Sequence, residues 1–425
     1  MPEKPIALPW FIPTPDVLPP QRATLRLGLG RSERYFREVV VPGIGGVSFV
    51  RQLSWAIAGV TLGSSVPRRQ PSRIANGIEA LACKLNQGEA ASDGRLRGVR
   101  AFARSPDTFA FADLSQRKYY VQVTYRQGTV GALLSSGLGF TEQSQRFNAM
   151  ACTRHGVDLA EAFLGQSQVR RQQSLRAVLL DWARGDAVPD LDHRRLAEAI
   201  SPGRPTPAEQ RIVRERLESI AAQVPHGVPL KRRLQLVELL RGRSSEPTYA
   251  SIVKRLDEVG KRQLDLALVF AQLAASARDV VRAAAIGLNA APRALASKLA
   301  DDKTVAESLR VLRDRSRDYL RAAPQTGLED AGADAIARSG DLDNPGARLI
   351  SVVGHDGIGL ACDDGKSVRQ GPRYDIVLRN AREGDATADD SDESDTGIVA
   401  DETGLRLSRL RQLWILLQDC NDASR

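Results

Sequence analysis

The sequence is poor in cysteine, histidine, methionine and aromatic residues. It has four cysteines, four histidines and two methionines among 425 residues, and aromatic residues make up 5% of the chain. The cysteines, Cys83, Cys152, Cys362 and Cys420, are far apart, and none belongs to a C-x-x-C pair. A disulfide framework and a zinc ribbon both need closely spaced cysteines, so the sequence supports neither. A zinc site built from distant residues stays open.

A long apolar run is also missing. The longest stretch, from Val39 to Val60, is interrupted by Pro42, four glycines and Arg51. A membrane-spanning helix needs about 20 predominantly apolar residues, so we interpret this stretch as protein core. The first 20 residues contain acids and prolines where a signal peptide would have a basic head and an apolar run. We therefore expect a cytoplasmic protein.

Most motifs of catalysis are absent. No G-x-S-x-G, H-E-x-x-H, kinase-type or complete Walker motif occurs. The run VVVPGIGG at 39–46 has Ser48 where a dinucleotide loop would have its last glycine, which favours a structural turn. Asp356 and Asp364-Gly365-Lys366 match the acids and lysine of magnesium-dependent nucleases, although Asp-Asp-Gly-Lys at 363–366 is also an ordinary hairpin turn. We expect no catalytic residue, metal or cofactor, and keep a metal-dependent nuclease as an alternative.

The charge is unevenly distributed. The net charge is +9 and the isoelectric point is near 9.6, yet residues 383–402 contain nine acids and no base. The other 405 residues have 60 bases against 42 acids, which gives +18. We expect the acidic tract to be a disordered loop and the basic body to have a polyanionic partner.

Hydrophobic periodicity predicts a mainly α-helical fold. Residues 47–61 and 73–86 have apolar side chains at helical spacing, and we expect them to pack as a pair. Further helices are predicted over 170–183, 206–223, 230–242, 248–288, 303–322 and 403–419. The β-branched runs RYFREVVV (34–41), LISVV (349–353) and YDIVL (374–378) favour strands.

Changes in composition suggest four parts. They are a Pro-rich arm and helix pair (1–94), a basic module (95–167), a Leu/Ala/Arg-rich helical bundle (168–325), and a small α+β region with the acidic loop 383–402 (345–425). The long helices of the bundle and the terminal helix could also form partner surfaces.

The basic module is the most informative segment. Residues 95–126 have seven bases against two acids, with three tyrosines interleaved. We predict a helix over 115–134, a glycine turn at 137–139, a short β element, and a helix that starts after Thr153. Gly128 and Gly131 would each cost the first helix about 1 kcal/mol relative to alanine.

This order of elements resembles the winged-helix DNA-binding domains. Gly137 and Gly139 match the connection after the recognition helix, Arg146 to Ala151 match the wing, and Thr153-Arg154-His155-Gly156 matches the Thr-x-x-Gly that starts the next helix. Cys152 stands where these domains usually have leucine. The resemblance covers about 70 residues and implies binding to double-stranded DNA.

Seven residues are the candidate contacts with nucleic acid. Five could share or border one face of the helix and two would extend the contact across the wing: Arg117, Lys118, Gln122, Tyr125, Arg126, Arg146 and Arg154. Arginine and glutamine can read base edges, and arginine and lysine neutralise phosphates. Alternatively, the arginines form a solvated face and the tyrosines belong to the core, or the segment contacts RNA or protein.

We therefore predict a non-enzymatic DNA-binding protein. The Ala/Arg/Gly-rich composition is typical of bacterial proteins, and such a protein could be a regulator or a subunit of a DNA-processing or anti-phage defence assembly. The main alternative is a helical interaction subunit that does not touch nucleic acid.

Overall fold

The computed structural model describes most of the chain. The described residues are 25, 27–66, 70–87, 95–104, 108–116, 119–121, 123–142, 144, 146–167, 169, 172–185, 193–246, 248–289, 291–362, 364–383 and 408–421. They form a mainly α-helical protein with a small three-stranded antiparallel sheet, which confirms the mainly helical part of the predicted fold class. The Pro-rich arm and, except for Glu383, the acidic tract lie outside the described residues.

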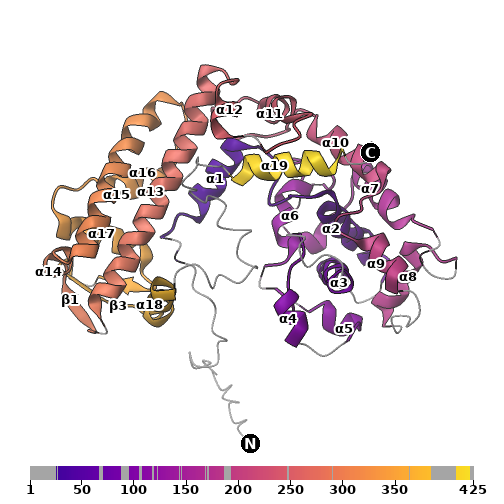
Figure 1. The fold of residues 1–425 in the computed structure, drawn as a ribbon, viewed down its shortest axis with the longest axis horizontal. Helices are drawn as coiled ribbons and strands as arrows, with labels where there is room; N and C mark the ends of the chain where they lie inside the picture. The colour runs from indigo at the N-terminus through magenta and orange to yellow at the C-terminus, as the bar shows by residue number, and fades with distance from the viewer. Residues whose placement is uncertain are drawn as a thin grey trace, which may run out of the picture.

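The helices form two groups on opposite sides of the molecule (Figure 1). The first group comprises α2 (Val50–Gly63), α3 (Pro71–Leu85), α4 (Val99–Arg104), α5 (Phe111–Leu114), α6 (Tyr125–Leu133), α7 (Arg154–Leu164), α8 (Leu175–Arg184) and α9 (His193–Ile200). The second comprises α13 (Glu258–Leu288), α14 (Ala296–Ala300), α15 (Lys303–Ala322), α16 (Ala331–Gly340), α17 (Pro345–Asp356) and α18 (Tyr374–Glu383). The sheet belongs to the second group, with β1 (Arg293–Leu295) and β2 (Leu360–Ala361) on either side of β3 (Ser367–Gln370).

Five helices join the two groups. They are α1 (Gly30–Val40), α10 (Pro207–Leu217), α11 (Arg232–Leu240), α12 (Tyr249–Val253) and α19 (Ser408–Asp419). The last helix, α19, brings the end of the chain back onto the first group. There Asp419 accepts a hydrogen bond from the Val50 backbone N–H at 2.7 Å and pairs with Arg95 at 2.9 Å. The carboxylate thus interacts favourably with the positive end of α2.

The predicted helix pair is confirmed as α2 and α3. The two helices approach closely at Gly59, because a Cβ atom there would lie 2.5 Å from the Cβ of Ala75. Nearly all of α2 is buried, including the charged Arg51. A fully buried charge is tolerated only when it is paired and hydrogen-bonded.

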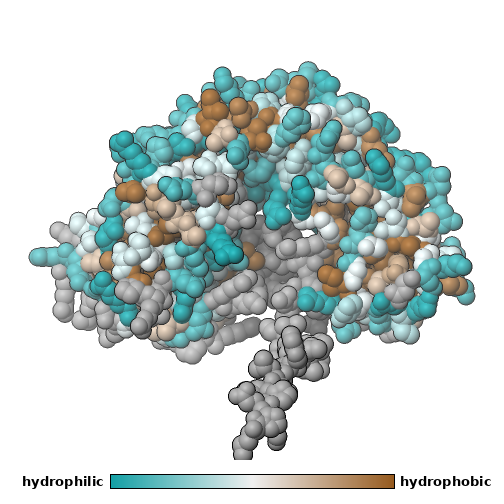
Figure 2. Space-filling view, turned by 180° about the vertical axis from the view of Figure 1, so that it is seen from behind, coloured by the Kyte–Doolittle hydropathy of each residue, from teal (hydrophilic) through white to brown (hydrophobic). Residues whose placement is uncertain are grey.

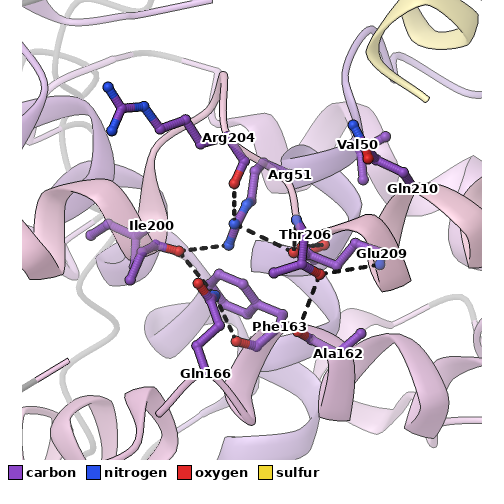
Figure 3. A network of polar contacts seen from close by, with 12 residues as sticks. Val50, Arg51, Ala162, Phe163, Gln166, Ile200, Arg204, Thr206, Glu209 and Gln210 are labelled. Atoms are coloured by element: carbon purple, nitrogen blue, oxygen red, sulfur yellow. Dashed lines mark hydrogen bonds and ion pairs between the residues drawn. The ribbon is translucent and has the colours of Figure 1, made fainter. Parts of the chain in front are cut away.

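Arg51 lies in a buried polar network (Figure 3). Its guanidinium pairs with Glu209 at 3.4 Å, donates to the carbonyls of Ala199 and Arg204, and lies over the ring of Phe163. Burial lowers the pKa of Arg51, and the Glu209 carboxylate partly offsets this. Glu209 also accepts from the Thr206 backbone N–H at 2.8 Å, which completes a capping box at the start of α10. The network therefore ties α2, α7 and α10 together.

Three strand predictions are wrong. Residues 34–41 lie mostly in α1, where Phe36 stacks on Phe270 of α13 with 4.3 Å between the ring centres. LISVV and YDIVL lie in α17 and α18. Asn344 caps α17 and Pro345 occupies its first turn, so these helix-start signals outweigh the β-branched residues. Strand preference is weak compared with packing, and here the buried faces repeat at helical spacing.

Two predicted helices are interrupted. The segment 248–288 divides into α12 and α13, because Asp257 caps α13 by accepting from the Gly260 N–H at 2.6 Å. In the segment 115–134, the described residues before Tyr125 are not helical, so this prediction is wrong for its first half. The helix begins there because Thr124 is extended and its backbone N–H donates to the Gln127 side chain at 3.0 Å.

Hydrophobic side chains are largely internal. Nearly every leucine, valine and phenylalanine of the described helices packs into one continuous core. In the part of the chain that the structure describes, no helix is both long and apolar enough to cross a membrane.

Candidate nucleic-acid interface

Several basic segments meet at one end of the α2–α3 hairpin. The loop that precedes α7 lies against this end: Asn148 accepts from the Ser72 backbone N–H at 2.9 Å, and Cys152 lies 3.5 Å from the Thr61 hydroxyl. On the same helix end, Arg73 donates to the Ser115 hydroxyl at 3.2 Å. Residues near 61, 72, 115 and 150 in the sequence are thus neighbours in space.

The loop before α7 is a short β-like hairpin. Thr141 and Cys152 form an antiparallel bridge, and the Thr153 N–H donates to the Phe140 carbonyl at 3.0 Å. Between these ends, residues 147–149 form a turn of 3-10 helix. The residues expected to form a wing, 146–151, thus include a 3-10 turn beside a single bridge, and the described residues of this loop contain no pair of strands.

The Thr-x-x-Gly junction has a clear structural role. Thr153 caps α7 by accepting from the Gly156 N–H at 3.3 Å. A Cβ atom at Gly156 would lie 2.0 Å from the Phe140 carbonyl oxygen, so only glycine fits. The two residues therefore fix the angle between the hairpin and α7.

Arg146 and Arg154 are exposed at the two ends of this loop region. Arg154 occupies the first position of α7, and Arg146 immediately precedes the 3-10 turn. Within the described residues, neither guanidinium has a hydrogen bond or ion pair. Both side chains are therefore available to a ligand from solution.

Arg126 is held more firmly. Its Nε donates to the Asn76 side chain of α3 at 2.8 Å, and its guanidinium carbon lies 5.0 Å from the centre of the Phe147 ring. The side chain is half-buried and so presents only part of its guanidinium to solvent. Arg126 thus bridges α3 and the hairpin loop.

A buried acid, Glu79, fixes the start of α6. Glu79 is 1% exposed, and it accepts from the Tyr120 hydroxyl at 2.7 Å and from the Arg126 backbone N–H at 2.9 Å. Burial raises the pKa of Glu79 to about 7, and the two hydrogen bonds and the charges of Arg126 and Arg97 limit the rise. The acid therefore changes charge near neutral pH.

Tyr125 belongs to the core. It is 2% exposed, packs edge-on against Phe49, and donates its hydroxyl to the Arg95 carbonyl. The guanidinium carbon of Arg97 lies 4.0 Å from the centre of the Tyr125 ring. Tyr125 therefore cannot contact a ligand without local unfolding, as the alternative interpretation of the tyrosines expected.

The remaining predicted contacts, Arg117, Lys118 and Gln122, lie outside the described residues. Arg117 and Lys118 directly follow Ser115 and Gln116 in the sequence, and Ser115 is bonded to Arg73. No sequence pattern pointed to Arg73, Asn76, Glu79 or Asn148 as residues of the site. Arg73 and Asn76 could have been inferred only from their place on the predicted helix 73–86.

The other candidate motifs have structural roles. The glycine turn packs on α6, where the Gly46 N–H donates to the Gly128 carbonyl at 2.6 Å. Asp364 accepts from the backbone N–H groups of Lys366 and Ser367, which lowers its pKa to about 2, and pairs with Arg293. It therefore forms the hairpin turn between β2 and β3.

Asp356 also has a local role, since it accepts from two backbone N–H groups that follow α17. Over the described ranges, no group of three or more His, Cys, Asp or Glu side chains is arranged to hold a metal ion. No family model, curated protein or solved structure matches the chain.

Proposed function

We propose that the chain is a non-enzymatic protein that binds double-stranded DNA. The contact surface is the basic end of the α2–α3 hairpin, defined by Arg73, Arg126, Arg146 and Arg154. The observation that carries the proposal is the convergence of these residues from separate segments, as the hydrogen bonds of Ser72, Asn76 and Ser115 indicate.

This surface suits phosphate groups. Arg146 and Arg154 are exposed, and Arg126 is oriented by Asn76 and Phe147, so less side-chain freedom is lost on binding. Glu142 is the one acid between 140 and 156, so bases prevail in the loop. Arginine side chains on a duplex neutralise phosphates and release counterions.

We do not expect α6 to read DNA bases. A recognition helix must expose the face that enters the major groove. Of the nine residues of α6, Gly131 alone is exposed, and the others are buried or half-buried. We therefore expect contacts that are mainly with the backbone of DNA and weakly dependent on sequence.

The test is the salt dependence of DNA affinity. For a duplex, the logarithm of the binding constant falls with the logarithm of salt concentration by about 0.9 for each phosphate neutralised. Replacing Arg146 and Arg154 together with alanine should reduce this slope by roughly 2 and weaken binding. The matched control replaces Arg31 and Arg338, which are exposed on α1 and α16.

Two results would count against the proposal. One is a wild-type chain without measurable affinity for duplex DNA at low salt. The other is an equal change of slope in both double variants, which would mean diffuse attraction to the basic body. In the cell, a protein of this kind would serve as a regulator or as a subunit of a DNA-processing or defence assembly.

A further inference from the structure

Ile220, Leu230 and Val259 are large hydrophobic side chains that are exposed to solvent, and together they define a second candidate surface. These side chains are 52%, 53% and 46% exposed, and they are three of the eight large hydrophobic side chains that are exposed in the described part of the chain. Figure 2 shows hydrophobic side chains gathered at the top of the molecule, where Figure 1 places α11, α12 and the first turns of α13. Exposed apolar clusters of this kind mark interaction sites.

Buried polar contacts hold the three segments together. Arg233 donates to the carbonyl of Ser219, next to Ile220, at 3.1 Å. Arg232, two residues after Leu230, donates to Gln263 of α13 at 2.7 Å. Gln263 in turn donates to the carbonyl of Gly227 at 2.7 Å.

Arg232, Arg233 and Gln263 are fully buried, so solvent does not compete for these contacts. Arg232 Nη2 also lies 3.6 Å from the place of a Cβ atom on Gly260, the residue after Val259. The three segments that present the apolar side chains are therefore already in place before a partner binds.

Bases surround the apolar side chains. Lys231, Arg255 and Arg262 are exposed beside Leu230 and Val259. The acids beside Ile220 and Val259 have partners of their own: Glu218 pairs with Arg241 at 2.7 Å, Asp257 caps α13, and Glu258 pairs with Lys261 at 2.6 Å. The rim is thus positively charged around an apolar centre.

We propose that the Ile220–Leu230–Val259 surface binds an acidic amphipathic helix of a partner protein. Apolar side chains of the helix would cover the three exposed residues, and its carboxylates would face Lys231 and Arg255. DNA fits this surface poorly, because a duplex offers phosphates to the rim but nothing to cover the apolar centre. The inference is independent of the DNA-binding proposal, which concerns the end of the α2–α3 hairpin.

The test uses the full chain and a fluorescent peptide. The probe is a helix of about 20 residues with leucine at i, i+3, i+4 and i+7 and glutamate elsewhere. Its anisotropy should report saturable binding that weakens as salt rises. The same peptide with lysine in place of glutamate should bind at least about tenfold more weakly.

Variants locate the binding. Replacing Ile220 and Leu230 with aspartate should weaken peptide binding at least about tenfold, whereas the same change at Leu342 and Ile358, which are 41% and 48% exposed elsewhere, should leave it unchanged. The double variant Lys231→Glu and Arg255→Glu tests the charged rim. Both side chains are exposed, so this test does not depend on whether the aspartate variants fold.

The proposal is overturned if the wild-type chain does not bind the acidic peptide, or if both aspartate variants lose binding equally. Displacement of the peptide by duplex DNA would also overturn it, because the two surfaces would then be one. A wild-type chain that self-associates, and a variant at Ile220 and Leu230 that does not, would assign the surface to a second copy instead.

Discussion

The buried acid Glu79 makes stability depend on pH in a direction opposite to that of most carboxylates. Its pKa is about 7 in the folded chain against an ordinary value of 4.5, because burial penalises the charged form. Below pH 4.5 the acid is protonated in both the folded and the unfolded chain. As the pH rises, the unfolded chain releases this proton first, so stability falls until the pH has passed 7.

The size of the effect follows from the shift. A rise of the pKa from 4.5 to about 7 corresponds to roughly 3 kcal/mol of unfolding free energy, and most of it is lost between pH 5 and pH 8. Glu79→Gln has nearly the same shape, keeps an oxygen that can accept from the Arg126 backbone N–H, and does not ionise. The stability of the wild type relative to this variant should therefore fall by about 2 to 3 kcal/mol over that range.

Urea unfolding followed by circular dichroism at pH 5, 6, 7 and 8 measures this difference, and contributions of all other titrating groups cancel between the two chains. Tyr120→Phe is the companion variant. It removes a hydrogen bond that favours the carboxylate, so the loss of stability should move to higher pH. If the stabilities of the wild type and Glu79→Gln run parallel from pH 5 to pH 8, the reasoning is refuted.

Two further predictions concern packing. Glu209→Ala should lower the unfolding free energy by about 3 to 5 kcal/mol, because it leaves Arg51 charged and unpaired in the core; a loss below 1 kcal/mol in urea unfolding would contradict this. Gly128→Ala should raise stability by up to about 1 kcal/mol, because the new Cβ atom would lie at an ordinary contact distance of 3.5 Å from Gly46. Gly45→Ala should lower stability, because Gly45 has φ +52° and its Cβ atom would lie 2.9 Å from the Ala132 nitrogen. Thermal unfolding of both variants tests the contrast.

Elements with both periodicity and end signals were predictable from the sequence. The predicted helix over 206–223 forms α10, which Thr206 caps, and the predicted pair 47–61 and 73–86 forms α2 and α3. The strand predictions failed where β-branched residues alone were considered. In α17, for example, Leu349, Val352 and Val353 are buried together at helical spacing, and tertiary packing decided the conformation.

The candidate site was predictable in part, for a physical reason. Arg146 and Arg154 are exposed because they lie on a hairpin and at a helix start, both of which the sequence indicated. Tyr125 was misplaced because the predicted helix over 115–134 began about ten residues too early. Once the helix starts at Tyr125, its first residue faces α2 rather than the outside.

The role of Glu79 could not be read from the sequence, because it depends on two partners that are about 41 and 47 residues away. An acid among apolar residues of a predicted helix is ordinarily assigned to the solvent face, yet here the Tyr120 hydroxyl and the Arg126 N–H replace water. Burial of Glu79 is stable only if the Tyr120 hydroxyl and the Arg126 N–H are both in place to donate hydrogen bonds. Glu79 therefore links the packing of α3 to the placement of Arg126, and through Arg126 to the basic surface, so the buried acid and the proposed DNA contact are parts of one arrangement.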